Sequence, residues 1–203
     1  MLATQAQAAP ETYVIDPAHT FPHYEVSHLG ISTHRGRFDR TRGEIVLDRE
    51  AGTGAIDITI DTNMVSTGLG LLDAVLKGED FFNTAQFPTM SFRARSIAFE
   101  GDVPKRATGE LTLVGVTRPL ELSILRFGCT RLPFLVRLTC GADVVANIRR
   151  SDFGMTSYSA FVGDEVKLLI QIEAAREERA AKAEQPEAQG GFTGTITGGG
   201  RWK

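Results

Sequence analysis

The chain has 203 residues, of which 42% are hydrophobic and 23% charged, and this is the composition of an ordinary globular domain with its own core. Its 22 basic residues are scattered among 25 acids, and the net charge of −3 argues against a nucleic-acid partner, whose phosphates need a basic surface. No run of about 18 apolar residues occurs, so no transmembrane helix is predicted.

Residues 1–12 precede the first predicted strand. Ala6-Gln7-Ala8 resembles the small-residue end of a secretory signal with cleavage after Ala8, although the apolar segment that should come before it is missing. We expect residues 1–12 to be a leader, the remnant of a signal peptide. An alanine-rich leader with no targeting role is the alternative.

Three strand-like segments follow, at 13–27, 35–48 and 55–62. Proline is expected to break the first segment at Pro17 and Pro22, and Gly36 and Gly43 are expected to bend or bulge the second. The third reads Ala-Ile-Asp-Ile-Thr-Ile-Asp-Thr, which gives one apolar face and one polar face, because side chains alternate across a strand.

The period then changes to that of a helix. Leu69, Leu72, Val75 and Leu76 lie at helical spacing, with Thr67 as the expected N-cap. This pattern predicts one short helical insertion, at about residues 69–83, which covers the core as a lid.

Alternation returns in five further segments, at 90–95, 110–113, 120–124, 142–148 and 167–174. With the first three this makes about eight strands joined by short polar turns, so we predict an all-β fold, an eight-stranded antiparallel barrel. Such a barrel is either filled by its own side chains or holds one small ligand, and periodicity leaves both alternatives open. Residues 177–203 are expected to form a short charged helix and a flexible glycine-rich tail.

The patterns of common catalytic and metal sites are missing. The chain has no GxSxG, GxGxxG, Walker-type or CxxC motif, and its four histidines have neither an HxH spacing nor an acid at a suitable ligand spacing. We therefore predict no catalytic residues, no metal and no cofactor. An enzyme that acts on a bound lipid with His19 or His28 as base stays the alternative.

Cys129 and Cys140 flank one apparent hairpin, and they are either a disulfide or two unrelated buried thiols. The loop at 130–139 between them is unusually apolar for a surface turn. We interpret this loop as a pocket rim, a transient membrane contact or a homodimer contact, against the alternative that it folds back on the core. An interaction protein that uses this loop is a further hypothesis.

Several short motifs, taken together, resemble the YceI-like domain family over about residues 13–176. They are Asp16-Pro17-Ala18-His19-Thr20, His28-Leu29-Gly30-Ile31-Ser32, Gly36-Arg37-Phe38, Asp80-Phe81-Phe82 with Pro88-Thr89, Gly109-Glu110-Leu111-Thr112-Leu113, Gly115-Val116-Thr117-Arg118-Pro119 and Arg150-Ser151-Asp152-Phe153-Gly154-Met155.

The resemblance implies an extended lipocalin-like barrel in the periplasm, with an elongated cavity for a polyisoprenoid, an isoprenoid quinone or a fatty amide. It also implies that Cys129 and Cys140 pair, and it brings no catalytic residue set. We expect a non-covalently bound long-chain lipid, carried or stored. The predicted ligand-binding residues are Ile56, Ile58, Ile60, Phe92, Leu111, Leu113, Val144, Ile148 and Phe153 for the apolar wall, and His28, Arg35 and Arg150 for the head group.

Overall fold

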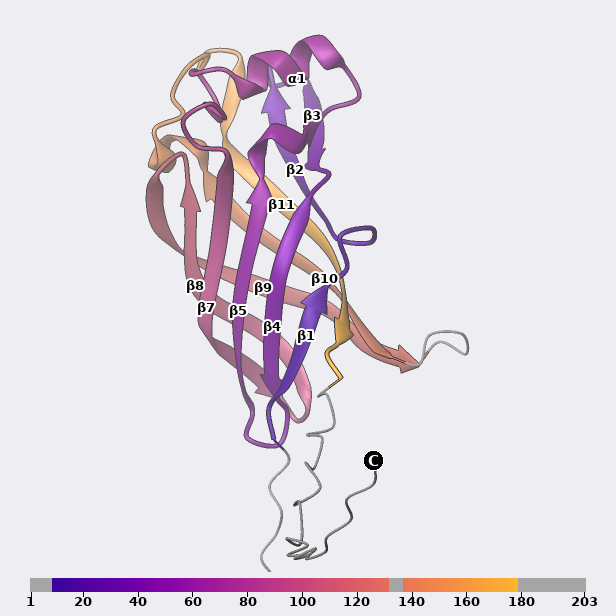
Figure 1. Cartoon of the computed structure of the whole chain (residues 1–203). Coiled ribbons are helices and arrows are strands. Elements are labelled where there is room, and N and C mark those ends of the chain that lie inside the picture. The colour runs from indigo at the N-terminus through magenta and orange to yellow at the C-terminus, as the bar shows by residue number, and fades with distance from the viewer. Residues whose placement is uncertain (1–8, 132–136, 179–203) are drawn as a thin grey trace, which may run out of the picture.

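Alternating apolar and polar residues form eleven antiparallel strands within residues 9–131 and 137–178, which the computed structural model describes (Figure 1). In chain order the strands are β1 (Glu11–Ile15), β2 (Phe21–His28), β3 (Ser32–Phe38), β4 (Thr41–Asp48), β5 (Thr53–Asp61), β6 (Val65–Ser66), β7 (Thr89–Glu100), β8 (Val103–Leu113), β9 (Val116–Arg131), β10 (Leu138–Arg149) and β11 (Val162–Arg176). The helix α1 (Gly70–Lys77) and two 3-10 turns (Thr62–Met64 and Arg150–Phe153) complete the described elements.

Three pairs of consecutive strands each serve as one long span of the barrel: β1 with β2, β3 with β4 and β5 with β6. β1 and β2 both pair with β11, and on their other side they pair with β4 and β3 respectively. β4 and β3 pair in turn with β5 and β6. Counting each pair as one span gives eight spans, and the β1–β11 pairing closes the ring. The predicted eight-stranded barrel is therefore confirmed.

The first predicted strand is interrupted at one place. The break lies at residues 16–20, between β1 and β2, as expected from Pro17. Pro22 lies inside β2 and does not break it, so that expectation was wrong. The pairing of β2 with β3 begins only at His23, one residue beyond this proline.

Two glycines let neighbouring groups approach the backbone closely. A Cβ at Gly36 would lie 2.4 Å from the Tyr24 hydroxyl, so the missing side chain makes room for the tyrosine ring. Gly43 has a φ of 138°, and a Cβ there would lie 2.1 Å from the Asp57 carbonyl oxygen. The β2–β3 register is continuous past Gly36 and the β4–β5 register is continuous past Gly43, so neither glycine forms a bulge.

The helical insertion is shorter than predicted. α1 covers Gly70–Lys77, and Leu69 is its N-cap, so Thr67 was wrongly assigned to that position. Thr67 instead donates its hydroxyl to Asp73 in the first turn of the helix, with 2.6 Å between Oγ1 and Oδ1. None of the helices in the described part of the chain is long and apolar enough to cross a membrane.

The connections gather at two opposite ends of the barrel (Figure 1). One end, called the α1 end below, carries the β2–β3 turn at residues 29–31, the segment 67–88 with α1, and the β10–β11 connection at residues 150–161. The other end, called the disulfide end, carries the β4–β5 and β7–β8 turns, the start of β1 and the end of β11.

Candidate functional site

The inward faces of the spans surround a cavity of about 210 Å³, called the main cavity below. All eight spans and α1 contribute to its wall, and most of the contributing side chains are aliphatic or aromatic. The wall includes His34 and Arg35, whose side chains are exposed, so the cavity reaches the surface beside β3. A barrel with a dry, open interior can bury an apolar ligand, because each CH₂ removed from water stabilises the complex by about 0.8 kcal/mol.

The predicted apolar wall residues lie in three different places. Seven of the nine line the main cavity: Ile56, Ile58, Ile60, Phe92, Leu111, Leu113 and Ile148. Val144 lines a second cavity of about 60 Å³, called the small cavity. Phe153 is buried but lines neither of these two cavities. Contact of these side chains with a ligand stays a prediction.

The three predicted head-group residues are not equivalent either. Arg35 lines the main cavity, and its Nε donates to Glu25 Oε1 over 2.7 Å. His28 does not line it, but its ring stacks on that of His34, with 4.2 Å between the centroids, and His34 does. His34 and Arg35 therefore lie beside the opening of the main cavity, whereas His28 packs against His34 and does not line the cavity.

Arg150 lines the main cavity but is committed to the protein backbone. Only 5% of this residue is exposed, and its guanidinium donates to four carbonyl oxygens. Nε donates to Gly163 over 2.9 Å, Nη2 to Val162 over 3.0 Å, and Nη1 to Met155 and Ser157 over 2.7 and 2.8 Å. Arg150 therefore holds the connection between β10 and β11 in place at the α1 end.

Three polar wall residues were missed in the sequence. Tyr24 lies in the main cavity, and burial, with a smaller effect of the Asp73 carboxylate, raises its pKa to about 12. Thr20 is buried and exchanges two hydrogen bonds with the Glu173 backbone. Thr41 is 1% exposed, and within the described residues its hydroxyl has no hydrogen-bond partner. Alternation predicts that such residues face inward but not which of them lack a partner.

His19 belongs to a cluster that spacing along the chain did not predict. Its Nδ1 lies 2.7 Å from Asp16 Oδ2. The side-chain nitrogen and oxygen atoms of Asp16, His19 and Glu173 that could bind a metal ion all lie within 4.8 Å of one another. The hydrogen bond with Asp16 raises the pKa of His19, and it lowers the pKa of Asp16. Asp16 and His19 therefore form a hydrogen-bonded pair on the outside of the barrel, and His19 lines neither cavity.

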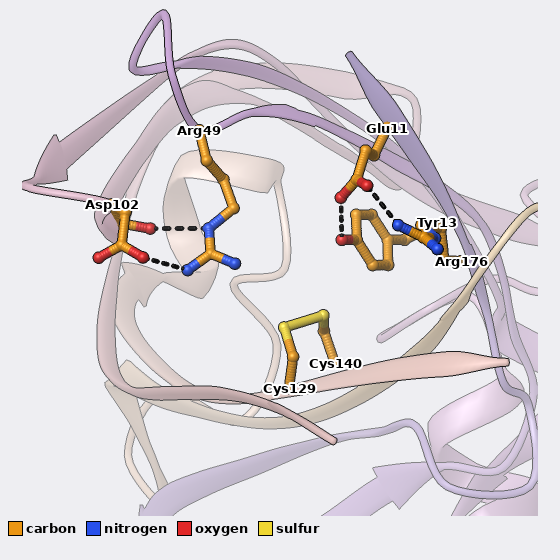
Figure 2. Close-up of a disulfide and its surroundings, with 7 residues drawn as sticks. All are labelled: Glu11, Tyr13, Arg49, Asp102, Cys129, Cys140 and Arg176. Atoms are coloured by element: carbon orange, nitrogen blue, oxygen red, sulfur yellow. Dashed lines mark hydrogen bonds and ion pairs between the residues drawn. A yellow bond between two sulfur atoms is a disulfide. The ribbon is translucent and has the colours of Figure 1, made fainter. Parts of the chain in front are cut away.

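The small cavity continues the main one toward the disulfide end. The two cavities share wall residues Ile45, Ile56, Leu122 and Ile172, and Cys140 and Tyr13 lie at the far end of the small cavity. The predicted disulfide is confirmed, because Cys129 and Cys140 are directly opposed on β9 and β10 and are bonded (Figure 2). Residues 132–136 of the apolar loop beyond it lie outside the described residues.

Polar side chains pair with one another near the disulfide (Figure 2). Tyr13 donates its hydroxyl to Glu11 over 2.6 Å, and Arg176 donates to the other oxygen of Glu11 over 2.5 Å. Burial, followed by the bond to Glu11, raises the pKa of Tyr13 to about 12, and the Tyr13 hydroxyl is the main cause that lowers the pKa of Glu11. Arg49 donates to Asp102 over 2.5 Å at the neighbouring turns.

The sequence matches a family model described as the YceI-like domain over residues 13–174. Protein YceI of Salmonella arizonae is 31% identical to the chain over 180 residues, which cover 87% of this chain and 93% of that protein. The chain therefore belongs to the YceI-like family, as its motifs predicted.

Solved structures share the barrel. BcnA of Burkholderia cenocepacia has a TM-score of 0.65 at 22% identity and covers 79% of this chain and 99% of its own. The YceI protein of Campylobacter jejuni has a TM-score of 0.64 at 26% identity, with 75% of this chain and 90% of its own covered. A polyisoprenoid binding domain from Saccharophagus degradans has a TM-score of 0.59 at 16% identity, with 81% and 98% covered. BcnA and the Saccharophagus domain are evidence for the fold alone.

Proposed function

We propose that this member of the YceI-like family binds a long-chain amphiphile in its barrel and acts as a carrier or reservoir for it. The observation that carries the proposal is the main cavity, which has an apolar wall from all eight spans and reaches the surface beside His34 and Arg35. A polyisoprenoid, an isoprenoid quinone or a fatty amide has the long apolar tail that suits such a wall.

The position of the polar groups supports one orientation of this ligand. The tail would lie along Ile58, Leu111 and Leu113, deeper in the barrel, and the polar head would lie at the opening near Arg35. Arg35 is already paired with Glu25, so it would contact a head group from an existing ion pair. Arg150 has four N–H groups bound to carbonyls and would offer only the remaining one.

The periplasm is the compartment we propose for this activity. The Cys129–Cys140 disulfide supports it, because structural disulfides persist in oxidising compartments. Fractionation of the source cells by osmotic shock tests the proposal, and recovery of the protein with the cytoplasmic fraction would contradict it.

The two histidines named as bases in the enzyme alternative do not line the cavities. A base needs to reach the bound molecule, and neither His19 nor His28 lines either of the two cavities. The interaction-protein alternative concerns the loop at 130–139, of which residues 132–136 lie outside the described residues.

Organic extraction and mass spectrometry of the purified protein test lipid binding directly. We expect one long-chain amphiphile per protein in the wild type and a strong loss in Ile58→Trp, which would fill the main cavity from β5. Thr59→Trp is the matched control, because its side chain points to the other face of the same strand. Equal lipid content in both variants, or a ligand-free wild type, would contradict the proposal.

A further inference from the structure

Among the described residues, the exposed large apolar side chains are concentrated at one end of the barrel. Nine large apolar side chains are exposed among the described residues, and seven of them lie on the three segments of the α1 end. We call these seven the apolar rim: Leu29, Ile31, Leu69, Leu71, Val75, Tyr158 and Phe161. The other two, Val14 and Leu125, lie on strands β1 and β9.

Direct contacts hold the three segments of the apolar rim together. The Leu29 amide donates to the Phe161 carbonyl over 2.7 Å, which ties the β2–β3 turn to the β10–β11 connection. The ring of Phe81, just after α1, stacks on Tyr158 with 5.7 Å between the centroids. Ser157 Oγ also donates to Asp80 over 2.7 Å. The rim is therefore one connected surface and not a set of separate exposed residues.

α1 carries apolar side chains on two faces. Leu72 and Leu76 line the main cavity, whereas Leu71 is 80% exposed and Val75 50% exposed. A helix at the surface of a soluble domain ordinarily turns a polar face outward. The same helix therefore contributes apolar side chains both to the apolar rim and to the wall of the proposed lipid site.

The shape and charge of the rim favour a lipid surface over a protein partner. Ile31 is 83% exposed at the tip of a tight turn, and a projecting apolar tip suits insertion into a deformable interfacial layer. The arginines nearest the opening are already paired, Arg35 with Glu25 over 2.7 Å and Arg37 with Asp39 over 2.6 Å.

We propose that the apolar rim docks on the surface of a phospholipid bilayer, where the tail of the ligand passes directly between the bilayer and the main cavity. The proposal rests on the proposed function, because docking beside the opening spares the apolar tail a passage through water, which is unfavourable for every CH₂ exposed. Since the nearby arginines are paired, docking requires no anionic lipid and depends weakly on salt.

Vesicle flotation tests docking without any assumption about the ligand. We expect wild-type protein to bind phosphatidylcholine vesicles, and the triple variant Ile31→Ser, Leu71→Ser, Phe161→Ser to bind at least about tenfold more weakly. The matched control is Val14→Ser with Leu125→Ser, which removes exposed apolar side chains away from the rim and is expected to bind like the wild type. Equal binding by both variants, or binding only to vesicles with anionic lipid, would overturn the proposal.

Transfer of a pyrene-labelled long-chain fatty acid separates docking from lipid binding. The rim variant is expected to take up this probe from ethanol as the wild type does, and to take it up at least about tenfold more slowly from vesicles. Loss of uptake from ethanol would show that the rim side chains are part of the cavity site and would overturn the docking proposal. A wild type that floats with vesicles but never binds the probe would contradict the proposed function instead. A wild type that dimerises through the rim and does not float would mean that a second copy covers it.

Discussion

The two ends of the barrel differ in their internal bonds and in the side chains that they expose among the described residues. At the disulfide end the polar groups pair within the protein, Glu11 with Tyr13 and Arg176, and a covalent bond joins β9 to β10 (Figure 2). At the α1 end a buried arginine organises the backbone, and seven large apolar side chains are exposed on the three connecting segments. Among the residues that the structure describes, the exposed apolar side chains thus gather at the α1 end, which the docking proposal places against the bilayer.

The largest effect is expected from Arg150→Met, which breaks the organisation of the α1 end. The substitution removes four hydrogen bonds from a charged donor and leaves the carbonyls of Met155, Ser157, Val162 and Gly163 to find water. We expect a loss of about 4 kcal/mol in the free energy of unfolding, measured by urea denaturation. Uptake of the pyrene-labelled fatty acid from vesicles should fall as well.

Arg149→Met is the matched control for this prediction. Arg149 is the exposed neighbour at the end of β10, and its replacement is expected to change the stability by less than about 0.5 kcal/mol. Similar losses in the two variants would contradict a special role for the buried guanidinium.

The disulfide provides the corresponding test at the other end. Replacing Cys129 and Cys140 by serine frees a loop with a sequence separation of 11, which the chain-entropy model relates to about 3 kcal/mol of stability. We expect this loss in urea denaturation, with probe uptake from vesicles unchanged. The wild type in reductant should match the double variant. A parallel loss of uptake would mean that the two ends are coupled.

One tyrosine with a raised pKa lies near each end, and both predict a loss of stability in alkali. The pKa is raised from 10.0 to about 12 for Tyr13 and for Tyr24, in each case mainly by burial. A raised pKa means that the contribution is fully present below pH 10 and is lost as the pH rises toward 12. Each tyrosine can account for about 2 kcal/mol of that loss.

The variants Tyr13→Phe and Tyr24→Phe measure the two contributions separately. The free energy of unfolding at pH 8, 10, 11 and 12 should fall less steeply in each variant than in the wild type. The comparison with the wild type cancels the other groups that titrate in the same range. If the free energy of unfolding falls as steeply with pH in Tyr24→Phe as in the wild type, solvent reaches the Tyr24 hydroxyl through the opening.

Much of the barrel was predictable, because alternation and turn residues act locally. The face of Ile56, Ile58 and Ile60, for example, points into the barrel as its period predicted. The apolar rim was not predicted, since a turn residue such as Ile31 is exposed or covered according to what other segments place beside it. The same holds for Arg150, whose four acceptors lie on the β10–β11 connection and at the start of β11, up to 13 residues away.

The hydrogen-bond partners of the polar side chains were the least predictable part, for a physical reason. Periodicity sorts side chains onto faces, but the partner of a polar group depends on distances between spans that are remote in sequence. His19 illustrates this, since Glu173 of its cluster is on β11, at the other end of the chain. Family motifs indicated the cavity and the disulfide, and they left the polar contacts of His28, Arg35 and Arg150 undetermined.

The smallest expected effects come from two threonines on the wall of the main cavity, between the two ends. Thr20 Oγ1 donates to the Glu173 carbonyl over 2.9 Å and accepts from its amide over 3.0 Å, so Thr20→Val should cost about 1–2 kcal/mol. Thr41 Oγ1 has no partner among the described residues, so Thr41→Val should stabilise the protein by about 1 kcal/mol. Urea denaturation of delipidated protein measures both, and the identical substitution cancels the gain of a methyl group. A loss of stability in both variants would mean that water forms a hydrogen bond with the Thr41 hydroxyl in solution. Thr41→Val would then remove the last polar contact at this position of the cavity wall and leave a surface that suits an apolar tail.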